Sequence, residues 1–128
     1  MRNKSYKPII LLIEDDRVSR LYVSEILKNH HYNLFKATNG NQALKQLVIH
    51  PEISLILMDI LLPDINGFIL LNYLRIQNIH LPIIAHTAHT AYFSKAKCIS
   101  AGFDGVLFKP YSPNDLLEML SSVLEVEC

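Results

Sequence analysis

The sequence predicts an α/β fold, a doubly wound five-stranded parallel sheet with strand order 2-1-3-4-5 and helices on both faces. Five short apolar runs alternate along the chain with five segments whose apolar residues recur at helical spacing, which is typical of strand-helix repeats. The strongest of these runs are apolar without interruption, as strands buried on both faces are. Because 128 residues with 50% apolar content can form one core, we expect a single domain over residues 1–128.

Turn and breaker residues divide the apolar runs into predicted strands. Pro51 and Pro63 bound the central run, and the pair Asn39-Gly40 closes the second and weakest one. The five predicted strands are residues 8–13, 33–38, 55–58, 81–85 and 106–108. Right-handed crossovers between such strands leave few topologies, of which we select the order given above.

Capping residues place the ends of several predicted helices. Asp16 is a candidate N-cap, Gly102 stands where a helix stops, and Ser112 can cap a helix whose first turn contains Pro113. The five predicted helices run from 17 to about 29, from 43 to about 50, from 68 to about 78, from 91 to 101 and from 113 to 124.

The composition restricts the partners and the compartment. Twelve basic residues balance twelve acidic ones, so the overall charge does not favour direct binding to a nucleic acid or to an acidic membrane. Cys98 and Cys128 are the two cysteines, which argues against a disulfide framework and for a reducing compartment, the cytoplasm. The apolar run 9–13 is too short for a signal peptide or a spanning helix.

Charged side chains follow the predicted strands at one edge of the sheet. Glu14 and Asp15 follow the first strand and Asp59 follows the third, so the three carboxylates should meet where the strand order reverses. Thr87 and Lys109 follow the fourth and fifth strands. Carboxylates that converge in this way require cations, and an open cluster of oxygen ligands suits Mg²⁺.

These residue types together predict phosphoryl-transfer chemistry, in which catalysis is mostly positioning and charge neutralisation. Asp59 would be the nucleophile, because a carboxylate can form an acyl phosphate. Thr87 could donate a hydrogen bond to one phosphoryl oxygen, and Lys109 could pair with another.

The chain resembles the receiver domain of two-component response regulators from Ile9 to about Val123. The motifs that carry the resemblance are Leu12-Ile13-Glu14-Asp15-Asp16, Leu57-Met58-Asp59 with Pro63 and Gly67, Pro82-Ile83-Ile84-Ala85 before Thr87-Ala88, Ala101-Gly102 and Lys109-Pro110. The resemblance implies a flavodoxin-like fold and a signalling module that is not an enzyme for an external substrate. It also implies a cis peptide bond at Lys109-Pro110.

The resemblance further implies roles for the site residues. Asp59 would accept a phosphoryl group from a histidine kinase or a histidine phosphotransfer protein. Asp15, Asp59 and the backbone carbonyl of Leu61 would hold Mg²⁺ or Mn²⁺, with Glu14 acting through water. A downstream protein would bind the surface of the fourth helix, fifth strand and fifth helix, and the chain would be a monomer or a phosphorylation-dependent dimer.

Three residues depart from the family pattern. Val106 stands where the family usually has an aromatic residue whose ring moves on phosphorylation. Valine has no such ring, so this chain must signal phosphorylation in another way. Asn66 replaces a common aspartate before Gly67. His86 replaces an apolar residue before Thr87, and we expect it to face a helix.

Two other functions and one other context are open. A metal-dependent phosphohydrolase would also use Asp59 as nucleophile, but such enzymes usually carry a second acid two residues later, where this chain has Leu61. A flavin-binding module would need a run of Gly, Ser and Thr after the first strand to bind the phosphate, and the sequence has no such run there. We expect a lone receiver, with a receiver from a longer hybrid kinase or regulator as the alternative.

Overall fold

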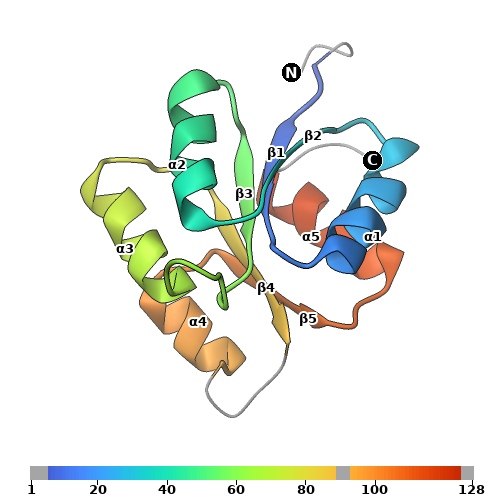
Figure 1. Cartoon of the computed structure of the whole chain (residues 1–128). Coiled ribbons are helices and arrows are strands. Elements are labelled where there is room, and N and C mark those ends of the chain that lie inside the picture. Colours follow the sequence, from blue (N-terminus) through green and yellow to red (C-terminus); the bar gives the residue numbers. More distant parts are fainter. Residues whose placement is uncertain (1–5, 89–92, 125–128) are drawn as a thin grey trace.

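The computed structural model describes residues 6–88 and 93–124 of the chain (Figure 1). Its five strands form one parallel sheet with the order β2-β1-β3-β4-β5. The strands are β1 (Ile9–Ile13), β2 (Asn33–Ala37), β3 (Leu55–Met58), β4 (Ile83–Ala88) and β5 (Gly105–Lys109). The predicted fold class and strand order are therefore confirmed.

Five helices cover the two faces of the sheet in two layers. They are α1 (Arg17–Lys28), α2 (Gly40–Ile49), α3 (Gly67–Ile76), α4 (Lys95–Ala101) and α5 (Pro113–Leu124). Helices α2, α3 and α4 lie on one face, and α1 and α5 lie on the other (Figure 1). Along β1, Leu11 and Ile13 pack toward the first layer, whereas Ile10 and Leu12 pack toward the second. Both faces of the strand are buried, which explains why its sequence is apolar throughout.

The predicted caps and the predicted cis bond are confirmed. The carboxylate of Asp16 accepts a hydrogen bond from the N–H of Ser19 at 2.8 Å. Gly102 ends α4 with a φ of +115°, a left-handed conformation that glycine adopts without strain. The Oγ of Ser112 accepts from the N–H of Asp115 at 3.1 Å, at the start of α5. The Lys109-Pro110 peptide bond is cis.

The structure corrects the bounds of three elements by more than two residues. Strand β4 begins at Ile83 and continues to Ala88, because its whole second half pairs with β5. Helix α2 begins at Gly40, because Asn39 is its N-cap as well as the end of the preceding turn. Helix α4 begins at Lys95 after the N-cap Ser94.

Some predictions fall on residues that the structure does not describe. Residues 91 and 92, the predicted start of the fourth helix, lie outside the described residues, as does Cys128. The described cysteine, Cys98, is free and buried. Within the described ranges, no helix combines the length and the apolar character that crossing a bilayer requires.

Candidate functional site

Three carboxylates meet at the carboxyl edge of the sheet. Glu14 and Asp15 follow β1 and Asp59 follows β3, and one oxygen of each lies within 4.8 Å of the other two. Glu14 is fully buried and Asp59 is 7% exposed, whereas Asp15 is exposed. The cluster is therefore sealed on one side and open to solvent on the other, and carboxylates so close together could hold a metal ion.

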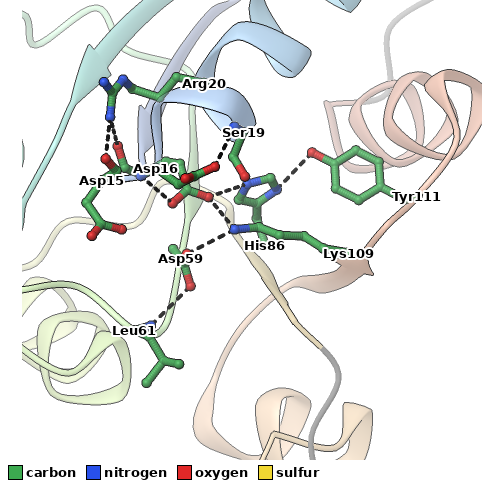
Figure 2. A network of polar contacts seen from close by, with 10 residues as sticks. Asp15, Asp16, Ser19, Arg20, Asp59, Leu61, His86, Lys109 and Tyr111 are labelled. Atoms are coloured by element: carbon green, nitrogen blue, oxygen red, sulfur yellow. Dashed lines mark hydrogen bonds and ion pairs between the residues drawn. The ribbon is translucent and has the colours of Figure 1, made fainter.

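The ammonium group of Lys109 contacts both buried carboxylates, and Figure 2 shows its contact with Asp59. Its Nζ donates to Oε1 of Glu14 and, at 3.1 Å, to Oδ2 of Asp59. The other oxygen of Asp59, Oδ1, accepts from the N–H of Leu61 at 3.1 Å. One positive charge at the end of β5 thus offsets the repulsion between two acids from different strands.

Glu14 is held in its ionised form by donors from three parts of the chain. Oε1 accepts from Nε2 of His86 at 2.9 Å and from Lys109, and Oε2 accepts from the N–H of Asp16 at 3.1 Å. Burial alone would raise the pKa of Glu14, but these hydrogen bonds outweigh burial and lower the pKa to about 2. Glu14 is therefore a fixed negative charge at neutral pH.

The surroundings of Asp59 shift its pKa in the opposite direction from that of Glu14. Burial raises the pKa of Asp59 above its ordinary value, and the negative charge of Glu14 raises it further. Lys109 and the N–H of Leu61 oppose this shift without cancelling it. Ionised Asp59 is thus a destabilised charge, which favours binding of a cation beside it.

Replacing Asp59 with asparagine is expected to stabilise the metal-free protein at neutral pH. A folded-state pKa above the unfolded value of about 3.9 means that ionisation of Asp59 opposes folding as the pH rises through both values. The free energy of unfolding of the variant should therefore exceed that of the parent by about 1 kcal/mol at pH 7, which raises Tm by a few degrees. Denaturant unfolding in EDTA measures this, and the difference should shrink toward pH 4. Equal or lower stability of the variant at pH 7 would contradict the expected direction.

Thr87 carries an unsatisfied hydroxyl close to the end of β4. The residue is 1% exposed, and Oγ1 has no hydrogen-bonding partner in the described part of the chain. Leaving a buried hydroxyl unpaired costs about 1–3 kcal/mol, so this oxygen is available for a ligand. Thr87 is adjacent to β5 through its pairing with Phe108.

The structure brings Glu14, Asp15, Asp59 and Lys109 together as the sequence predicts. Leu61 joins the site through its backbone N–H, and its side chain is 58% exposed. The chemical roles assigned to these residues stay predictions.

Three residues of the site were not singled out as functional from the sequence. His86 is buried on the α1 and α5 side of the sheet, as expected, but it also contacts Glu14. Tyr111 follows β5, and its Oη lies 2.8 Å from Nδ1 of His86. Arg20 of α1 donates to the backbone carbonyls of Glu14 and Asp15 at 3.0 and 2.7 Å. Only His86 had a signal in the sequence, its departure from an apolar position.

Fold and site together define a receiver-type signalling module, with acids after β1 and β3 and a lysine at the end of β5. The family model described as the response regulator receiver domain matches residues 10–121, and the chain belongs to this family.

Curated relatives and solved structures agree with this family. The chain is 28% identical over 115 residues to the cell cycle transcriptional regulator CtrA of Caulobacter vibrioides, covering 90% of this chain and 49% of CtrA. It is 30% identical over 121 residues to histidine kinase P4 of Formosa agariphila, covering 93% of this chain and 9% of the kinase. The chain thus spans half or less of the length of these two relatives.

Two solved structures are similar over almost the whole chain. The chemotaxis response regulator CheY4 of Vibrio cholerae has a TM-score of 0.82 and 28% identity, with 93% of this chain and 100% of that chain covered. The receiver domain of the Francisella response regulator 1452 has a TM-score of 0.83 and 26% identity, with 93% and 98% covered.

Proposed function

We propose that the chain is the phosphoacceptor switch of a two-component or phosphorelay system, with Asp59 accepting a phosphoryl group from a phosphohistidine donor. One observation carries the proposal. Asp59 is a buried carboxylate with a raised pKa, next to the ammonium of Lys109 and within 4.8 Å of two other acids. The donor would be a histidine kinase or a histidine phosphotransfer protein.

The transfer requires one bond to form as another breaks. A carboxylate oxygen of Asp59 attacks phosphorus, and the P–N bond of the phosphohistidine breaks as the acyl phosphate P–O bond forms. The donor imidazole leaves with the electron pair of that bond and takes a proton from water. Lys109, whose Nζ is 3.1 Å from Oδ2 of Asp59, neutralises charge on the transferred group. The unpaired hydroxyl of Thr87 is available to donate to a phosphoryl oxygen.

The donor set at the site fits Mg²⁺ or Mn²⁺. All of its candidate ligands are oxygens, and the exposed side at Asp15 leaves room for water ligands. Asp15, Asp59 and the carbonyl of Leu61 would hold the ion directly. Glu14 would act through water, because it is fully buried and its two oxygens already accept three hydrogen bonds. The bound ion would neutralise negative charge on the phosphoryl oxygens.

Phosphorylation would alter a protein-binding surface, and the chain would not turn over an external substrate. We assign the output to a protein partner at α4, β5 and α5, without direct binding to nucleic acid or membrane. The formal net charge of zero supports this assignment. We place the protein in the cytoplasm, as a monomer or a phosphorylation-dependent dimer. Val106 packs in the core under α4, so the readout does not use an aromatic ring at this position.

Intact mass measurement after incubation with acetyl phosphate and Mg²⁺ tests the proposal. The parent should gain the mass of one phosphoryl group, and Asp59→Asn should gain none. Asp16→Asn is the matched control, because Asp16 is a nearby acid that caps α1 and asparagine can take over the cap. This control should be modified like the parent. No gain in the parent, or an equal gain in Asp59→Asn, would rule out Asp59 as the acceptor.

A further inference from the structure

A buried chain of hydrogen bonds leads from the acidic cluster to the layer of α1 and α5, and the proposed transfer does not use it. Nε2 of His86 lies 2.9 Å from Oε1 of Glu14, and Nδ1 lies 2.8 Å from Oη of Tyr111 (Figure 2). Tyr22 of α1 donates to the backbone carbonyl of Tyr111 at 2.5 Å. His86 is 1% exposed and Tyr111 is 8% exposed. These contacts join His86, near the end of β4, to Glu14 after β1 and to Tyr111 after β5.

The partners of the imidazole determine where its proton lies. A carboxylate only accepts hydrogen bonds, so Nε2 of His86 carries the hydrogen that Glu14 accepts. The buried hydroxyl of Tyr111 then donates to Nδ1, the acceptor that the structure gives it within the described part of the chain. The two rings are also in edge contact, with centroids 5.5 Å apart. The two contacts therefore fix the orientation of the His86 ring, with Nε2–H directed at Glu14.

This donor matters because Glu14 shares Lys109 with Asp59. Lys109 must turn toward the phosphoryl group if it is to neutralise it, and Glu14 is fully buried. Without another strong donor at Oε1, that movement would leave a buried carboxylate poorly compensated. His86 donates to the same oxygen from β4, and this contact does not depend on Lys109. The hydrogen bond from His86 thus keeps Glu14 in place whichever way Lys109 turns.

We propose that His86, oriented by Tyr111, is a positioning residue that fixes the Glu14 carboxylate for cation binding and phosphoryl transfer. The proposal rests on the proposed function. Glu14 would reach the ion through water, and removal of the outer hydrogen-bonding partners of a metal site typically weakens metal affinity by about 10- to 100-fold. Tyr111 acts one step further away, by holding the imidazole.

Substitutions at His86 separate the hydrogen bond from the filling of space. His86→Leu fills the buried position without a donor, whereas His86→Gln places an amide N–H near the position of Nε2. In Mn²⁺ titrations followed by electron paramagnetic resonance, His86→Leu should bind about tenfold more weakly than the parent. His86→Gln should recover most of this loss, which a purely structural role would not require. Tyr73→Phe is the control, because Tyr73 is exposed on α3, which packs on the other face of the sheet, and its affinity should match the parent.

Nuclear magnetic resonance of the imidazole tests the same contact without relying on those variants. In the ¹⁵N-labelled parent, the Nε2–H proton of His86 should exchange slowly with water and shift when Mg²⁺ is added. Tyr111→Phe should make this proton exchange faster. Equal Mn²⁺ affinity in the parent and His86→Leu, or an Nε2–H signal unaffected by Mg²⁺, would overturn the positioning role alone. A parent that binds neither ion and accepts no phosphoryl group would overturn the proposed function as well.

Discussion

Replacing Lys109 with methionine is expected to lower the free energy of unfolding of the metal-free protein by about 3 kcal/mol. The substitution keeps much of the length of the side chain but removes the positive charge between Glu14 and Asp59. Glu14 is fully buried, and Asp59 is 7% exposed. Breaking a buried ion pair from one side costs about 3–5 kcal/mol. We expect the lower end, because Glu14 retains His86 and the N–H of Asp16 as donors.

The pH dependence of this loss has a definite sign. Burial lowers the pKa of Lys109, but its contacts with Glu14 and Asp59 outweigh burial and raise that pKa above its ordinary value. The stabilisation by Lys109 is therefore complete below its unfolded pKa of about 10.4 and is lost only as the pH rises through the higher folded value. Denaturant unfolding from about pH 6 to 9 should show an almost constant deficit.

Mg²⁺ should partly restore the stability of Lys109→Met, because a divalent ion supplies the missing positive charge. Phosphorylation by acetyl phosphate should still be slower by about 10²–10³-fold, the usual cost of one lost donor to a developing charge. Lys97→Met, on the exposed side of α4, is the control and should unfold within about 0.5 kcal/mol of the parent. Parent-like stability of Lys109→Met in EDTA would mean that the ammonium group does not hold the cluster together.

The sequence was sufficient for the fold and for the acidic cluster because both depend on residues at strand ends. Uninterrupted apolar runs identify strands that are buried on both faces, and the strand order brings their carboxyl ends to one edge. The positions of Glu14, Asp15 and Asp59 then follow from which strand each residue ends. Their separation of at most 4.8 Å agrees with that inference.

The partners of individual side chains were not predictable in the same way. His86 and Glu14 are 72 residues apart, and their contact depends on the pairing and alternation of three strands. The unusual polar residue at 86 signalled a departure from an apolar site, but nothing nearby in the sequence pointed to Tyr111. Strand β4 ended later than its apolar run because pairing with β5 continued through Ala88. Tertiary contacts decided both outcomes.

Replacing Gly67 with alanine is expected to cost about 2–3 kcal/mol of stability, because the added methyl group has no space. Gly67 is the first residue of α3, and a Cβ there would lie 2.7 Å from Cα of Ile60 and 3.0 Å from the carbonyl oxygen of Asp59. These atoms belong to the backbone, so the segment after β3 must shift. Thermal unfolding in EDTA measures the loss, which occurs despite the higher helix propensity of alanine.

Gly40→Ala is the matched control, because Gly40 is likewise the buried first residue of its helix, α2. There the nearest atom to an added Cβ is a side-chain methyl, Cγ2 of Ile65 at 2.5 Å, which can give way only if this branched side chain changes its rotamer or shifts. Gly40→Ala should therefore also lose stability, by about 1–3 kcal/mol. Only Gly67→Ala displaces the backbone at Asp59, so it alone should also slow phosphorylation by acetyl phosphate. Equal phosphorylation rates in the two variants would show that the close approach of α3 does not position Asp59.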